Sequence, residues 1–239
     1  MKPPVKLITF DAFGTLFRPL NGSIARLYTK EALRHGISIK EDNVMPSFKK
    51  AFCSVKSEHP NYGSRQGMNT RTWWANVVER TFIDAGVSEQ DLKKVFHELS
   101  DNLYNRFRTA EGYELYGETE EILSELTTLG IKLGVVSNSD ERVHEVLSSL
   151  GISSLLEFIL VSSEFGMEKP AKQIFDKALE LGEASGQETI HVGDDIENDY
   201  FGSKNAGLRS LLLQRLTTEP APPSFVQAIS SLREIINHL

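Results

Sequence analysis

Short apolar runs of strand length recur along the chain with helical patterns between them, and this alternation constrains the fold most strongly. The runs span residues 5–10, 131–137, 158–161 and 189–192, and residues 210–214 form a fifth candidate. Half-exposed strands alternate apolar and polar residues, whereas continuously apolar runs are typical of strands buried on both faces of a parallel sheet. The sequence therefore predicts a buried parallel β-sheet.

Helical patterns with clear ends connect these runs. Residues 118–129 stop at Gly130 and residues 141–150 stop at Gly151, and a glycine just after the last periodic residue is a common helix stop. Strands that alternate with helices of this length form right-handed βαβ units. We therefore expect an α/β fold with a Rossmann-like, doubly wound parallel sheet.

One long stretch breaks the alternation, because residues 19–110 contain helical patterns and no convincing strand. The helical patterns span residues 23–34, 43–56, 69–85 and 89–107. We predict an inserted all-helical domain at residues 19–110, which divides the Rossmann-like core into residues 1–18 and 111–239. Near the end of the chain, residues 219–223 predict a stiff turn, and Ser224 is expected to cap a last helix that runs to Leu239.

Composition excludes several classes of partner. The net charge of -7 comes without a basic block, so nucleic acid is not an expected partner. No apolar run approaches the roughly 20 residues of a membrane span. Cys53 is the only cysteine among 239 residues, which excludes an internal disulfide and favours a cytoplasmic location. The sequence does not indicate an oligomeric state.

Chemically active side chains follow the predicted strands. In an open parallel sheet, ligands bind outside the carboxyl ends of the strands, so the residues that come directly after each run are candidates for a site. They are Asp11 and Thr15 after the first run, Ser137 and Asn138 after the second, Lys169 after the third, and Asp194, Asp195 and Asp199 after the fourth. We expect one site to unite them, occupied by a small-molecule substrate.

Each of these residues also has an ordinary structural explanation. Asp11 is a common turn residue, Asn138 is a good helix cap, and Asp195 suits a helix N-terminus. Taken singly, these explanations are as good as the functional ones. Their occurrence together at successive strand ends favours an active site.

Four segments resemble the motifs of the haloacid dehalogenase-like hydrolase superfamily. They are residues 11–16 (DAFGTL), 136–138 (VSN), 168–170 (EKP) and 192–199 (VGDDIEND). The resemblance covers the whole chain and implies that the helical insertion is a cap domain. Within the insertion, residues 60–63 (PNYG) and 71–74 (RTWW) are similar to the subgroup called haloacid dehalogenase-like hydrolase domain-containing protein 3.

The resemblance implies a phosphatase in which Asp11 attacks the substrate and forms a covalent aspartyl intermediate. It implies the cofactor Mg2+, bound by Asp11 and the main-chain carbonyl of Phe13. It further implies that Asp194 is a metal ligand, that Asp195 is a ligand directly or through water, and that Asp199 supports these ligands. Ser137, which shares a motif with Asn138, would donate to the phosphoryl group, and Thr15 would be a further phosphoryl contact. Lys169 would be the cation that neutralises the carboxylates.

Phe13 departs from the family pattern. The phosphatases of the family carry a second aspartate there, which protonates the leaving group and then activates water. A positioned acid or base contributes roughly 10² to 10⁴ in rate. A phosphatase with Phe13 is therefore expected to be weak or selective, and to favour acyl or aryl phosphates. Phe13 is expected to pack in the wall of the site.

Two other interpretations stay open. A non-catalytic or regulatory protein would keep the metal site and bind a ligand without turnover. A 2-haloacid dehalogenase would expel halide without a proton, and that branch also has an aromatic residue at this position. Those enzymes lack the acid supplied here by Asp194, and their cap carries an arginine for the halide, whereas Lys49 and Lys50 occupy the corresponding segment.

Overall fold

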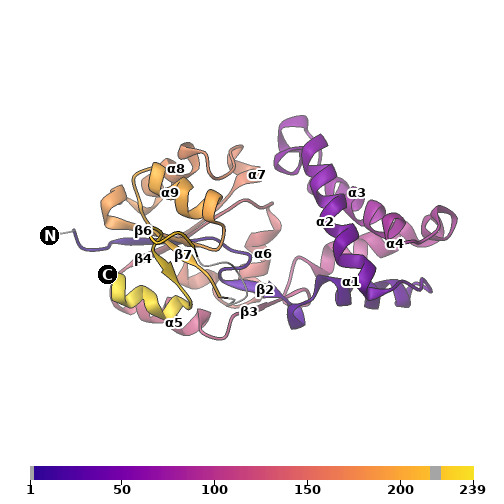
Figure 1. Ribbon diagram of the computed structural model, residues 1–239, viewed down its shortest axis with the longest axis horizontal. Helices are drawn as coiled ribbons and strands as arrows, with labels where there is room; N and C mark the ends of the chain where they lie inside the picture. The colour runs from indigo at the N-terminus through magenta and orange to yellow at the C-terminus, as the bar shows by residue number, and fades with distance from the viewer. Residues whose placement is uncertain (1–2, 216–221) are drawn as a thin grey trace. The chain divides into compact units, whose positions relative to one another are not determined.

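The computed structural model describes residues 3–215 and 222–239. It divides into two compact units, one formed by Met1–Arg18 with Leu115–Leu239 and the other by Pro19–Glu114. The first unit contains the large sheet and the second is helical (Figure 1). The helical unit is thus an insertion that follows the first strand of the sheet.

The large sheet has six parallel strands in the order β5-β4-β1-β6-β7-β8. Their bounds are β1 Leu7–Phe10, β4 Lys132–Ser137, β5 Phe158–Val161, β6 Thr189–Gly193, β7 Arg209–Leu213 and β8 Ala228–Ile229. β1 is buried along its whole length, as its continuously apolar sequence predicts. The expected α/β fold with a doubly wound parallel sheet is confirmed.

The position of β1 determines where a ligand can bind. Leu7 pairs with Lys132 of β4 on one side and with Thr189 of β6 on the other. The chain continues from β1 to β4 and β5 in one direction and later to β6, β7 and β8 in the other. The strand order therefore reverses beside β1, and a crevice at the carboxyl ends is expected at such a reversal.

Helices cover both faces of this sheet, with α8 and α9 on one face and α5 with η6 on the other (Figure 1). The helical elements of this unit are α5 Thr119–Thr128, α6 Arg142–Ser149, η3 Ser153–Leu155, α7 Ser162–Phe165, α8 Lys172–Gly182, η4 Gly186–Glu188, η5 Ile196–Phe201, α9 Gly202–Asn205 and η6 Leu232–His238. α5 and α6 begin and end within one residue of the predicted bounds.

The predicted C-terminal helix is wrong. The chain instead forms the short strand β8 and then the 3-10 helix η6, which Ser231 caps. The amide of Leu212 donates to the carbonyl of Gln227, and the amide of Gln214 donates to that of Ile229. Pairing with the free edge of β7 therefore replaces the helix. The predicted turn at residues 219–223 lies mostly outside the described residues.

The inserted unit consists of helices that pack on each other through apolar side chains. Their bounds are η1 Leu20–Gly22, α1 Ile24–Arg34, α2 Glu41–Glu58, η2 Asn61–Gln66, α3 Thr70–Asp84 and α4 Glu89–Arg106. Tyr28 stacks on Phe82, with their ring centroids 5.7 Å apart, in the larger of its apolar clusters. Trp73 is buried at the centre of the second cluster, which also includes the partly buried Trp74.

The chain leaves the first unit along β2 (Phe17–Pro19) and returns along β3 (Tyr113–Leu115), and these strands pair in a two-stranded sheet. These two strands leave no signal in the sequence, because three residues are too few to show a period. Among the described residues, no helix has the length and apolar character required to cross a membrane.

Candidate active site

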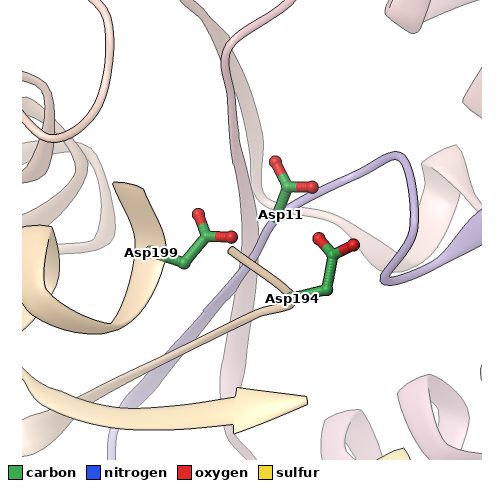
Figure 2. Close-up of side chains that lie close together, drawn as sticks. All are labelled: Asp11, Asp194 and Asp199. Carbon is green, nitrogen blue, oxygen red and sulfur yellow. The ribbon is translucent and has the colours of Figure 1, made fainter. Parts of the chain in front are cut away.

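Three carboxylates converge at the carboxyl ends of β1 and β6. Figure 2 shows the side chains of Asp11, Asp194 and Asp199 pointing toward one another. Each offers an oxygen atom that lies within 4.8 Å of the other two. Asp11 and Asp199 are buried, whereas Asp194 is exposed. The cluster therefore lies where the reversal of strand order predicts a ligand site.

Each carboxylate comes from a different segment. Asp11 directly follows β1, and its amide continues the ladder by donating to the carbonyl of Val192 at 2.9 Å. Asp194 directly follows β6. Asp199 lies in the π-helix η5, a rare element that is frequent at functional sites.

Two glycines permit the close approach of these carboxylates. Gly14 has a φ of +87°, and a Cβ atom there would lie 2.2 Å from Oδ2 of Asp194. A Cβ atom at Gly193 would lie 2.2 Å from Cγ of Asp199. Neither position can accept a side chain without displacing a carboxylate.

Lys169 connects two of the three acids. Its ammonium nitrogen lies 2.6 Å from Oδ1 of Asp11, 2.6 Å from Oδ1 of Asp199 and 2.7 Å from the carbonyl oxygen of Val136. The Lys169 side chain is 1% exposed, so solvent does not screen these contacts. Lys169 thus forms buried ion pairs with both Asp11 and Asp199.

Asn138 contacts the main chain of Lys169. It accepts a hydrogen bond from the Lys169 amide at Oδ1 and donates one to the Lys169 carbonyl from Nδ2. The main-chain amide and carbonyl of Lys169 are therefore both paired with the side-chain amide of Asn138. These two hydrogen bonds join Asn138 to the segment that carries Lys169.

Two polar residues of the site were not predicted from the sequence. His191, in β6, lies with Nε2 3.2 Å from Oδ1 of Asp199 and with Nδ1 2.9 Å from Oγ1 of Thr9 in β1. Thr9 and His191 are register partners and are both buried. The sequence contains one signal for them: each is a polar residue inside an otherwise apolar run, and the two positions pair when β1 and β6 are aligned.

Burial and neighbouring charges have opposite effects on the pKa values of Asp199 and Lys169. Burial disfavours ionisation of Asp199, but Lys169 and the hydrogen bond from His191 outweigh it and lower the pKa of Asp199. Burial also disfavours the Lys169 ammonium, but Asp11 and Asp199 raise its pKa. Burial lowers the pKa of His191, so a neutral ring donates from Nε2.

The pKa values of Asp11 and Asp194 are raised, whereas that of Asp199 is lowered. Burial raises the pKa of Asp11, and Lys169 counteracts this effect in part. Although the residue Asp194 is exposed as a whole, its carboxyl group faces the other two carboxylates (Figure 2), and desolvation of this group, together with the charges of Asp11 and Asp199, raises its pKa to about 7. One ammonium thus balances only one of three crowded carboxylates, and the cluster attracts a further cation.

Asp195 is not brought into this cluster. Its Oδ1 accepts hydrogen bonds from the amides of Glu197 and Asn198, and its Oδ2 accepts one from the side chain of Asn198. It is therefore the N-cap of η5. Its own amide donates to Oδ2 of Asp199 at 3.0 Å, so Asp195 fixes Asp199 through the main chain.

The remaining predicted residues lie around the turn after β1 and at the end of β4. Ser137 ends β4 and is 3% exposed. Thr15 is buried, and its hydroxyl has no hydrogen-bond partner among the described residues. Phe13 is 46% exposed and lies edge-on to Phe17, so the expectation that it packs in the wall as a core residue is wrong.

Arg215 supports the turn after β1 from outside the predicted motifs. Its Nη2 donates to the carbonyl of Thr15 at 2.8 Å, and Nη1 pairs with Glu118. Its guanidinium lies 3.7 Å from the ring centroid of Tyr116. These contacts fix the backbone that follows Asp11.

The cluster suits a hard divalent cation. Mg2+ prefers oxygen ligands such as carboxylates and usually keeps several of its water molecules. The close approach of Asp194, which depends on Gly14, places its carboxylate beside the like charges of Asp11 and Asp199. Asp11, Asp194 and Asp199 therefore fit a divalent metal.

Comparisons with known proteins agree with this geometry. A sequence model described as haloacid dehalogenase-like hydrolase matches residues 5–207. Haloacid dehalogenase-like hydrolase domain-containing protein 3 from Xenopus laevis is 34% identical, over 89% of this chain and 86% of the relative. The protein of the same name from Homo sapiens is 33% identical, over 87% of this chain and 82% of the relative.

Solved structures share the fold at lower sequence identity. A 2-haloacid dehalogenase from Pseudomonas syringae has a TM-score of 0.67 and is 19% identical, over 98% of this chain and 97% of that one. A phosphatase from Thermococcus onnurineus has a TM-score of 0.63 at 19% identity, with the same shares. A hydrolase from Bacillus subtilis, bound to magnesium in its crystal structure, has a TM-score of 0.67 at 17% identity and covers 99% of each chain.

Proposed function

Because the chain belongs to the haloacid dehalogenase-like hydrolase family, we propose that it is a Mg2+-dependent phosphatase that acts on a small phosphorylated metabolite. The observation that carries the proposal is the group of Asp11, Asp194 and Asp199 beside Lys169. The group combines a nucleophilic carboxylate, its orienting cation and the ligands for a divalent metal.

Asp11 is the nucleophile. One of its carboxylate oxygens forms a bond to phosphorus while the bond between phosphorus and the leaving oxygen breaks, which gives an aspartyl phosphate. Lys169 holds Oδ1 of Asp11 in place. Ser137 and Thr15 are the candidate donors to the phosphoryl oxygens.

Asp11, Asp194, Asp199 and the main-chain carbonyl of Phe13 are the candidates to hold Mg2+, and Asp195 supports them. When bound, the metal would supply charge stabilisation for the phosphoryl oxygens and would offset the repulsion among the carboxylates, which Lys169 alone does not balance.

Phe13 determines which substrates react. With no acid at this position, the leaving oxygen departs as an anion, which is easy for an aryl or acyl phosphate and difficult for an alkyl phosphate. The second step, in which water attacks phosphorus and the bond to Asp11 breaks, also has no base at this position. The aspartyl phosphate is therefore expected to accumulate.

The test is phosphate release from a panel of aryl, acyl and alkyl phosphates with Mg2+. The proposal predicts release that EDTA and Asp11→Asn both abolish, with a kcat/KM that falls steeply as the pKa of the leaving group rises, because kcat/KM reports the step in which the leaving group departs. Release that survives Asp11→Asn contradicts it. Halide release from 2-haloacids that survives EDTA would instead identify a dehalogenase.

A second candidate is a binding or regulatory protein that keeps the metal site without turnover. The exposed Phe13 in place of an acid favours this candidate. It predicts that a phosphorylated ligand raises the melting temperature in the presence of Mg2+ while no product forms.

We also propose that the helical unit Pro19–Glu114 is the cap that selects the substrate, as the resemblance to the haloacid dehalogenase-like hydrolases implies. Exchange of the helical unit with that of a relative is expected to change substrate preference without abolishing the dependence on Asp11.

A cytoplasmic location is proposed from the single cysteine, Cys53, which is unpaired.

A further inference from the structure

An unbroken row of side-chain contacts leads from Thr9 to Asp11. The hydroxyl of Thr9 lies 2.9 Å from Nδ1 of His191, and Nε2 of His191 lies 3.2 Å from Oδ1 of Asp199. The same oxygen of Asp199 lies 2.6 Å from Nζ of Lys169, which contacts Asp11 at 2.6 Å. Every residue in the row is buried.

The donors and acceptors in this row can be assigned from their chemistry. An ionised Asp199 only accepts hydrogen bonds, so Nε2 of His191 carries the proton and donates. In a neutral ring Nδ1 is then an acceptor, and the hydroxyl of Thr9 donates to it. The two residues therefore fix both the tautomer and the ring orientation of the histidine.

Asp199 depends on this support. Its Oδ2 is held by the amide of Asp195 and its Oδ1 by Lys169 and His191. The rings of His191 and Phe175 also pack in a T-shaped arrangement, with centroids 5.2 Å apart, which limits rotation of the histidine ring. Among the described residues, loss of the His191 donor would leave Lys169 as the only side-chain partner of the Asp199 carboxylate.

We propose that His191 and Thr9 are positioning residues, which hold the Asp199 carboxylate against Lys169 and beside the oxygens of Asp11 and Asp194, and thereby orient Asp11. The inference rests on the proposed function for the metal, and it assigns a role to two residues outside the predicted motif positions. Residues that orient metal ligands typically affect metal affinity or activity by 10- to 100-fold.

The test compares the Kd for Mg2+, measured by calorimetry, among four variants and the wild type. His191→Phe keeps a ring and removes both nitrogen atoms, and we expect it to raise Kd by roughly 10- to 100-fold. His191→Gln places an amide donor near the position of Nε2 and is expected to recover most of the affinity. Thr9→Val is expected to have an intermediate effect.

Thr189→Val is the matched control for Thr9→Val. Thr189 is also buried, but its hydroxyl donates to the carbonyl of Ser185 at the other end of β6. We expect this variant to lose stability without any change in Kd. A purely structural role for His191 predicts that both threonine variants behave alike and that glutamine gives no recovery, and this result would overturn the proposal.

Kinetics separate this inference from the proposed function. In an active enzyme, His191→Phe is expected to lower kcat with little change in KM, because it displaces the reacting carboxylates and leaves the substrate contacts. An inactive wild type with the expected order of Kd values contradicts the phosphatase and supports the positioning role. An active enzyme with unchanged Kd and kcat in His191→Phe and Thr9→Val contradicts the positioning role alone.

Discussion

The side chain of Asn138 and the main chain of Lys169 form a closed pair of hydrogen bonds. Oδ1 of Asn138 lies 2.6 Å from the amide nitrogen of Lys169, and Nδ2 lies 2.8 Å from its carbonyl oxygen. Because these segments follow the adjacent strands β4 and β5, the pair fixes the loop that delivers Lys169 to Asp11. The position of the cation therefore depends on a neutral amide.

Asn138→Ala removes this pair. We expect the free energy of unfolding to fall by roughly 1–3 kcal/mol, because two main-chain groups lose their partner. We also expect kcat/KM to fall, since Lys169 is held less firmly. Denaturation and steady-state kinetics measure the two effects. Asn205→Ala, at an exposed asparagine of α9, is the control and should change neither quantity.

Gly14→Ala tests the approach of Asp194. The substitution adds a Cβ atom where Oδ2 of Asp194 lies and strains a backbone with positive φ. Gly130→Ala is the matched control, because its φ is +77° and no atom lies within 4 Å of the added carbon. Both variants should lose roughly 1–3 kcal/mol of stability through strain. Only Gly14→Ala should lose Mg2+ affinity in calorimetry, and equal affinities would show that Asp194 is not a ligand.

Metal binding should depend on pH through Asp194. Mg2+ binds the ionised carboxylate, and the pKa of about 7 places its ionisation within the neutral range. Affinity for Mg2+ should therefore rise about tenfold between about pH 6 and pH 8. A flat profile, measured by calorimetry in buffers of constant ionic strength, would contradict the shift.

The same shift has a consequence for the protein without metal. Because the folded state raises the pKa of Asp194 above its usual value of 3.8, the fold favours the protonated form. The contribution of this group to stability is therefore lost as the pH rises from about 4 to about 7. Asp194→Asn should remove that part of the pH dependence in denaturation experiments done with EDTA.

Phe13→Asp should supply the missing acid and base. We expect kcat/KM for alkyl phosphates to rise by roughly 10²-fold or more, and that for aryl phosphates to change little, because only the alkyl leaving group needs the proton. The control is Phe13→Asn, because asparagine has nearly the size of aspartate but carries no acid. Equal effects of the two substitutions would show that position 13 acts through shape.

The large sheet could be predicted because strands buried on both faces leave a strong apolar signal, as in the LITF of β1. Glycine stops also located the ends of α5 and α6. The C-terminal segment could not be predicted, because its conformation depends on the free edge of β7, which is remote in the sequence. The residues Ala228 and Ile229 carry no strand signal of their own.

The carboxylates of the site could be located from the ends of the strands, but their contacts could not. The resemblance implies that Asp195 is a metal ligand directly or through water and that Asp199 supports the ligands, whereas in the structure Asp195 caps η5 and Asp199 contacts Lys169. His191 and Thr9 were passed over because each lies inside an apolar run. Their significance appears only when β1 and β6 are paired.

The most direct test of the phosphatase account is a mass spectrum of the protein quenched in acid after mixing with an aryl phosphate and Mg2+. The account predicts one added phosphoryl group, which digestion with pepsin in acid should place on a peptide that contains Asp11. The adduct should be absent with EDTA and in Asp11→Asn. Phosphate release without an adduct, and undiminished in Asp11→Asn, would contradict the assignment of Asp11 as the nucleophile.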